Sequence, residues 1–121
     1  MVMIYRINWN EKKETFERIE KTKYATVQEA QEAAEYEETQ RLDATRETPD
    51  RVYATISPAG CIDKIVQSEE ENGHVSAELI CFFIDGDGDV EAQLKAFLDA
   101  NEEYREFEDE IRALLKTENL L

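Results

Sequence analysis

The chain has 121 residues, and its 29 Asp and Glu against 14 Lys and Arg give a formal net charge of −15 with a single histidine. This length is typical of one domain, so we expect residues 1–121 to share a single core. Nucleic acids and anionic membrane surfaces both attract basic proteins, so the charge argues against direct binding to either. The same field would draw a basic protein partner toward the chain.

The sequence carries no signal for export or membrane insertion. A membrane span needs about 20 consecutive apolar residues, and no run approaches that length. The apolar start is interrupted by Arg6 and is too short for the core of a signal peptide. Cys61 and Cys81 lie in apolar, strand-like contexts, which favours buried, reduced thiols over a disulfide. We therefore expect a cytoplasmic protein.

The first third of the chain predicts a β-hairpin followed by a helix. Residues 1–9 and 15–24 flank a polar turn, which is typical of two antiparallel strands. Thr26 and Glu29 form a capping box, so helix is expected from there to about Leu42. Its expected buried stripe is small and consists of Val27, Ala30, Ala33 and Ala34. Its expected solvent-exposed face carries Glu29, Glu32, Glu35 and Glu38.

The rest of the chain predicts three strands and then helix. Residues 51–56, 61–67 and 74–84 are separated by turn residues, which favours an antiparallel meander. Beyond them, residues 90–98 and 104–115 repeat apolar side chains at helical spacing. Good N-cap residues near Asn101 favour two helices over one continuous helix.

These elements predict an α+β domain. We expect an antiparallel sheet of about five strands, in the chain order β-β-α-β-β-β-α-α, with the helices packed on one face. The pattern leaves open whether the two hairpins share one sheet. Leu114 and Leu115 would either complete the core or seal a homodimer.

The acidic segment from Asp85 to Asp89 invites a calcium interpretation. Asp85, Asp87 and Asp89 match positions 1, 3 and 5 of an EF-hand loop, but the glycine at position 6 and the glutamate at position 12 are missing. We favour a turn in which one of these aspartates caps the next helix. A weak, non-EF divalent site at the three aspartates is the alternative.

Catalytic signals are few. His74 could pair with Cys61 or Cys81, but thiolates are disfavoured inside apolar strands. No phosphate-binding glycine loop or nucleophile motif is present. The sequence therefore favours a protein that is not an enzyme and needs no cofactor.

The charge pattern of the last helix is the strongest functional signal. At 100° per residue, five acidic side chains fall within an arc of about 120° beside the apolar face. These residues are Glu102, Glu103, Glu106, Asp109 and Glu110. Asp87 and Asp89 join them as candidate partner contacts. Such a stripe either keeps the protein soluble or docks on a basic surface.

The sequence hypothesis is a small, non-catalytic interaction protein that binds a basic protein surface. Its partner would be a nucleic-acid-processing enzyme or a toxin. The chain would act as an inhibitor or nucleic-acid mimic, of the general kind found among bacterial immunity proteins and phage anti-defence proteins. The alternative hypothesis is a divalent-ion-dependent regulatory or ligand-binding module centred on Asp85–Asp89.

Overall fold

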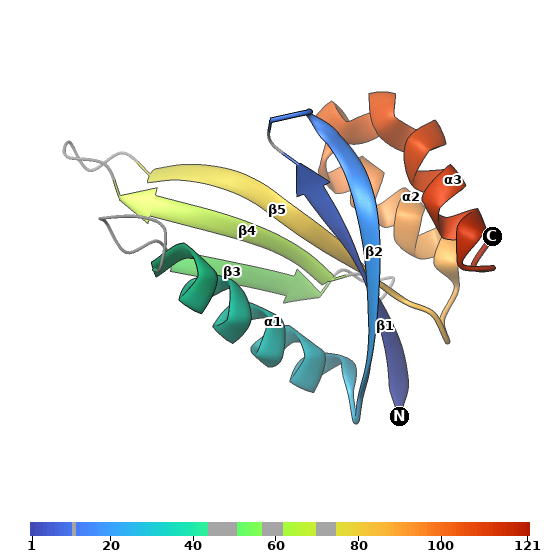
Figure 1. Cartoon of the computed structure of the whole chain (residues 1–121), viewed down its shortest axis with the longest axis horizontal. Helices are drawn as coiled ribbons and strands as arrows, with labels where there is room; N and C mark the ends of the chain where they lie inside the picture. The colour runs from blue at the N-terminus through green and yellow to red at the C-terminus, as the bar shows by residue number, and fades with distance from the viewer. Residues whose placement is uncertain (11, 44–50, 57–61, 70–74) are drawn as a thin grey trace.

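The computed structural model describes residues 1–10, 12–43, 51–56, 62–69 and 75–121 (Figure 1). The expected α+β class and chain order are confirmed, with a short 3-10 helix before the last α-helix. The elements are β1 (Val2–Asn10), β2 (Thr15–Tyr24), α1 (Val27–Asp43), β3 (Arg51–Ile56), β4 (Ile62–Glu69), β5 (Val75–Asp85), α2 (Val90–Ala100), η1 (Glu102–Phe107) and α3 (Glu108–Thr117).

The five strands form one antiparallel sheet in the order β2-β1-β5-β4-β3. Strand β5 lies in the centre and pairs with β1 on one side and β4 on the other, so both hairpins share one sheet. Apolar side chains of β5 face both sides of the sheet, since Phe82 and Phe83 belong to different core clusters. The nearly continuous apolar sequence of β5 therefore reflects a strand that is covered on both faces.

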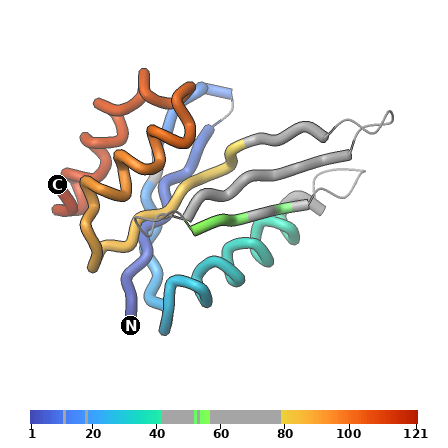
Figure 2. The backbone as a smooth tube through the Cα atoms, turned by 180° about the vertical axis from the view of Figure 1, so that it is seen from behind, coloured from blue at the N-terminus to red at the C-terminus, as the bar shows by residue number. Residues whose placement is uncertain are grey.

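The helices do not all pack on one face, and that expectation is wrong. Ala30 and Ala34 of α1 pack with Phe83 on one side of the sheet. Leu94 of α2 and Ile111 of α3 are buried in the larger cluster on the other side. Figures 1 and 2 show α1 and the α2–α3 pair as two separate layers. The small stripe of α1 limits how much of the core it can bury, and the aromatic cluster gathers under α2 and α3 instead.

The C-terminal region divides at Asn101, as expected. Helix α2 ends there because the backbone of Asn101 leaves helical geometry, with φ −133° and ψ 68°. The backbone N–H and the side-chain amide of Asn101 both donate to the carbonyl of Phe97, at 2.9 and 3.0 Å. Leu115 is fully buried and Leu114 packs against the same cluster, so both contribute to this chain's own core. None of the helices in the described residues combines the length and apolar character that crossing a bilayer requires.

Candidate functional site

The five acidic residues that the sequence singled out on its last helical region are all exposed. Glu102, Glu103 and Glu106 lie on η1, and Asp109 and Glu110 lie in the first turn of α3. We call these five residues the acidic ridge. They lie on two consecutive helices, within residues 102–110.

Aromatic packing fixes the inner side of the ridge to the sheet. The ring of Trp9 in β1 meets the rings of Tyr104 and Phe107 edge-on, with centroids 5.2 Å apart in each case. Ile111 continues the same side and is fully buried. Edge-to-face aromatic contacts of this kind are stabilising. The acidic side chains are therefore carried on a backbone that is packed against the core.

The geometry of the ridge differs from the predicted helical wheel. The wheel assumed an α-helix throughout, whereas residues 102–107 form a 3-10 helix with three residues per turn. In a 3-10 helix, residues three apart are eclipsed, so Glu103 and Glu106 share one side. Glu102 instead shares a side with Arg105, and their charged groups lie 4.0 Å apart.

Both arginines of the C-terminal helices pair with acidic residues of α2. Arg105 pairs with Asp99. Arg112 donates two hydrogen bonds to Glu91, at 2.5 and 3.0 Å, and one to Glu108 at 2.9 Å. The hydrogen bonds from Arg112 lower the pKa of Glu91, and the same contacts raise the pKa of Arg112.

These pairings hold the last helices to α2. Between them lies an open cavity of about 230 Å³, whose lining residues include Lys95, Leu98, Arg105 and Arg112. Arg112 donates three hydrogen bonds to its two carboxylate partners there. The cavity therefore lies beside a structural clamp on the inner side of the helices.

The outer part of the ridge keeps its charge uncompensated. Within the described residues, Glu103, Glu106 and Asp109 form no ion pair. Glu110 accepts a hydrogen bond of 2.5 Å from the hydroxyl of Thr15, which ties α3 to β2. Three carboxylates thus face solvent without a neutralising partner among the residues that the structure describes.

Asp87 and Asp89 are exposed but lie at the other end of α2 from Glu102. That helix has 11 residues, so its ends are roughly 16 Å apart. Asp89 is the N-cap of α2 and accepts the N–H of Ala92 at 3.0 Å, as the turn interpretation expected. Asp87 accepts the N–H of Met3 at 3.3 Å. Asp87 and Asp89 therefore lie away from the Glu102 end of the ridge.

Asp85 completes the turn through backbone and amide contacts. Its backbone N–H and carbonyl bind the buried side chain of Gln93, at 2.7 and 2.9 Å, and its carboxylate accepts the N–H of Asp87 at 2.9 Å. In the described part of the chain, no group of three or more His, Cys, Asp or Glu is placed to hold a metal ion. The three aspartates act as turn-forming groups in this geometry.

The candidate catalytic pair cannot be placed. His74 and Cys61 lie outside the described residues. Cys81 is fully buried in the cluster beneath α1, as its apolar context predicted. A buried thiol in apolar surroundings is a poor nucleophile.

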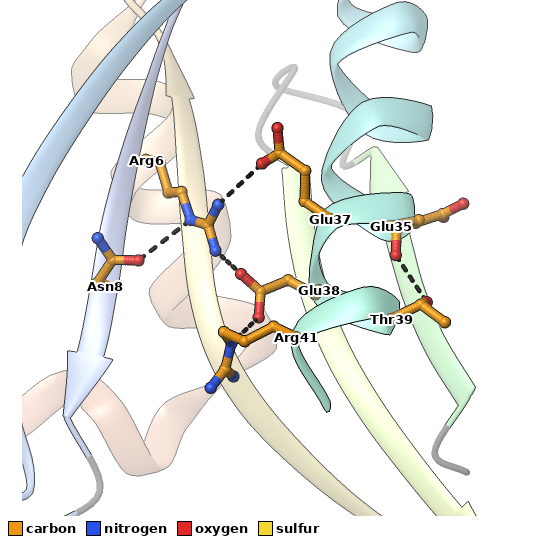
Figure 3. A network of polar contacts seen from close by, with 7 residues as sticks. All are labelled: Arg6, Asn8, Glu35, Glu37, Glu38, Thr39 and Arg41. Carbon is orange, nitrogen blue, oxygen red and sulfur yellow. Dashed lines mark hydrogen bonds and ion pairs between the residues drawn. The ribbon is translucent and has the colours of Figure 1, made fainter. Parts of the chain in front are cut away.

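The sequence interpretation missed a buried ion network between α1 and β1 (Figure 3). Glu38 was expected on the exposed face of α1, but its side chain is only 1% exposed. It pairs with Arg6 and, at 2.7 Å, with Arg41. Arg6 also contacts Glu37 at 3.4 Å and donates to the amide oxygen of Asn8 at 3.1 Å. The signal was present, because Glu38 continues the four-residue spacing of Ala30 and Ala34 toward the sheet.

A small cavity of about 50 Å³ adjoins this network, and its lining includes Arg6, Thr22, Tyr24 and Glu37. Burial, together with the nearby charge of Glu37, raises the pKa of Tyr24. The volume suits ordered water rather than a substrate. The network is therefore a packing feature.

The exposed acidic ridge remains the candidate functional site. It offers carboxylates on a fixed backbone, which can bind cationic groups of a partner. Comparison of the chain with protein-family models, with curated proteins and with solved structures found no significant match.

Proposed function

We propose that this is a small, non-catalytic interaction protein whose acidic ridge docks on a basic protein surface. The supporting observation is the separation of charges on the C-terminal helices. Arg105 and Arg112 are held by carboxylates that include Asp99 and Glu91 of α2, while Glu103, Glu106 and Asp109 have no ion pair in the described residues.

Two physical arguments favour a binding role over solubility alone. Eclipsed like charges such as Glu103 and Glu106 repel each other, which costs folding free energy without an evident benefit to the fold. The aromatic contacts of Trp9 also hold η1 in place before any partner arrives. A preorganised surface loses less conformational entropy on binding.

The partner that fits best is a protein with a basic groove or patch, such as a nucleic-acid-processing enzyme or a basic toxin. A row of carboxylates presents the same sign of charge that such a groove binds in a phosphate backbone. The protein would then act as an inhibitor or nucleic-acid mimic, in the manner of immunity or phage anti-defence proteins. Electrostatic steering would make its association fast and sensitive to salt.

The test compares the wild type with a triple variant, Glu103→Gln, Glu106→Gln and Asp109→Asn. A matched control carries Glu14→Gln, Glu29→Gln and Glu32→Gln, which removes the same charge from exposed positions elsewhere. Each protein is immobilised and used to capture partners from a native lysate of the source cells. We expect a basic protein that binds the wild type and the control but not the ridge variant, and that elutes as salt rises.

If the protein is a nucleic-acid mimic, it should also compete with nucleic acid for the captured partner. If the partner binds duplex DNA or RNA, then the wild type, but not the ridge variant, should compete with that nucleic acid. A partner that binds all three proteins equally, or that stays bound in 1 M salt, would contradict the role of the ridge.

A further inference from the structure

The two edge strands of the sheet, β3 and β2, differ in whether their outward backbone groups are hydrogen-bonded. At the β3 edge, the N–H of Ala54 donates to the Glu35 carboxylate at 3.0 Å, and its carbonyl accepts from the amide of Gln31. Helix α1 thus occupies the open backbone groups of β3 at Ala54. At the other edge, β2 has β1 as its only strand neighbour in the described sheet. Lys21 and Lys23 of β2 are exposed.

The register shows which backbone groups of β2 face outward. Gly86, which follows β5, donates its N–H to the carbonyl of Met3 at 2.8 Å, so the backbone groups of Met3 face β5. Because these groups alternate in direction along an antiparallel strand, those of Ile4 and Arg6 face β2. Their partners there are Thr22 and Glu20.

The intervening residues Ile19, Lys21 and Lys23 therefore point their N–H and C=O groups away from β1. Among the described residues, no side chain or loop hydrogen-bonds to the backbone of these three. A row of open backbone groups of this kind is a template for pairing with another strand.

The charges of β2 select one way to pair with a second copy. Outward residues must face outward residues, so a two-fold axis must pass through a single residue pair. An axis at Ile19 places Glu17 opposite Lys21 of the second copy, twice. The same register sets positions 18 and 20, an arginine and a glutamate, opposite each other. An axis at position 18, 20 or 21 would instead place a residue opposite its own like charge.

We propose that two copies pair through their β2 edges, antiparallel and centred on Ile19, to form a homodimer with a continuous sheet. Glu17 is the extra residue of a bulge opposite Trp9, so the regular ladder covers residues 18–20 of each copy and the Glu17–Lys21 pairs lie at its two ends. Within its own hairpin, Glu17 also contacts Lys13 at 3.8 Å and accepts a hydrogen bond from the Asn10 amide at 2.8 Å. Residues 1–24 carry six Lys or Arg and four Glu, a net charge of +2, while the remainder carries −17. Two strongly acidic molecules therefore repel each other least at this hairpin. The inference does not depend on the acidic ridge.

Sedimentation equilibrium over a range of concentrations at 0.15 M salt tests the proposal. The wild type should dimerise. Lys21→Glu creates two like-charge pairs and should weaken the dimer by about tenfold or more, because like charges directly opposite on neighbouring strands are destabilising. The double variant Glu17→Lys with Lys21→Glu restores opposite charges and should dimerise as the wild type does. Lys95→Glu on α2 makes the same change in net charge as Lys21→Glu and should leave dimerisation unchanged.

Lys21→Pro provides a second test that does not involve charge. It removes an outward N–H that pairing with β1 does not use, and proline is tolerated at such edge positions. The variant should keep the thermal unfolding transition of the monomer and lose the dimer. A wild type that stays monomeric at millimolar concentration would overturn the proposal. So would equal dimerisation of the wild type and Lys21→Glu, or a dimer that survives Lys21→Pro in a folded protein.

Discussion

Arg6 of β1 and Glu38 of α1 form an ion pair across the interface between helix and sheet, in which the Glu38 side chain is 1% exposed and the Arg6 side chain 18%. Desolvating two charges offsets much of their attraction, so such a pair adds little net stability over an apolar pair. Removing one partner, however, leaves the other charge with a single remaining ion pair among the described residues, to Glu37 for Arg6 or to Arg41 for Glu38. The pair therefore fixes where α1 lies on the sheet more than it adds to stability.

We expect Glu38→Gln to lower the free energy of unfolding by about 3 kcal/mol, the lower end for a broken buried pair, because Arg6 keeps Glu37 and Asn8. The double variant Arg6→Met with Glu38→Leu should lose less than that single variant, since it leaves no buried charge. Urea denaturation measures both. Glu37→Gln, at an exposed position, is the control and should cost at most about 1 kcal/mol. A double variant that is less stable than Glu38→Gln would contradict this account.

The contact between Glu35 and Ala54 closes the β3 edge and can be tested at one amide. Glu35→Ala removes the acceptor of the Ala54 N–H, so hydrogen exchange of that amide should accelerate and stability should fall by about 1 kcal/mol. Glu35→Gln keeps an acceptor oxygen and should retain most of the protection. Unchanged exchange in Glu35→Ala would mean that the edge is protected by other means.

The elements of this fold are encoded locally, and that is why the sequence predicted them. The Thr26 hydroxyl accepts the N–H of Glu29 at 3.1 Å, so the first half of the capping box is confirmed. Asp89 caps α2 in the same way. The placement of β5 between β1 and β4, by contrast, depends on contacts between segments far apart in the chain. Local periodicity does not report such contacts.

The site was predicted in composition but not in geometry. All five ridge residues are exposed, yet Tyr104 and Phe107 reach Trp9 on a 3-10 turn that a 100° wheel cannot represent. Glu38 was assigned to the exposed face because a helix with many glutamates is usually solvated on the side that carries them. Only its buried ion-pair partner shows that Glu38 faces the sheet. That partner, Arg6, is 32 residues away in sequence.

The bidentate contact between Arg112 and Glu91 makes the clamp between α3 and α2 sensitive to acid. The hydrogen bonds from Arg112 lower the pKa of Glu91 below its ordinary value of 4.5. A carboxylate with a lowered folded-state pKa contributes stability above its unfolded pKa and loses it as pH falls through the folded value. The stability difference between the wild type and Glu91→Gln should therefore be constant above about pH 5 and shrink below pH 4.5. Urea midpoints from pH 2 to 7 measure it, and a difference that persists at pH 2 would contradict the contribution of this pair.

The buried amide of Gln93 holds the turn before α2. It accepts from the N–H of Asp85 and donates to the carbonyl of the same residue. Gln93→Leu keeps the volume but leaves both backbone groups without their partner, so we expect a loss of about 1–3 kcal/mol in chemical denaturation. Gln93→Glu keeps an acceptor for the Asp85 N–H but loses the donor to its carbonyl. A Leu variant as stable as the wild type would show that water replaces the amide.

Repulsion within the acidic ridge should also lower the free energy of unfolding of the wild type. Glu103 and Glu106 share one side of η1, so the double variant Glu103→Gln with Glu106→Gln should raise the free energy of unfolding by a few tenths of a kcal/mol at low salt. The gain should vanish in 1 M salt, where the Debye length is about 3 Å. Glu102→Gln is the control, because Arg105 already lies near that carboxylate, and it should give no gain. Urea titrations at the two salt concentrations distinguish these cases. If the double variant is more stable but no longer captures the partner, the two carboxylates are retained for binding at the expense of folding. If it is less stable at both salt concentrations, the fold itself requires these carboxylates.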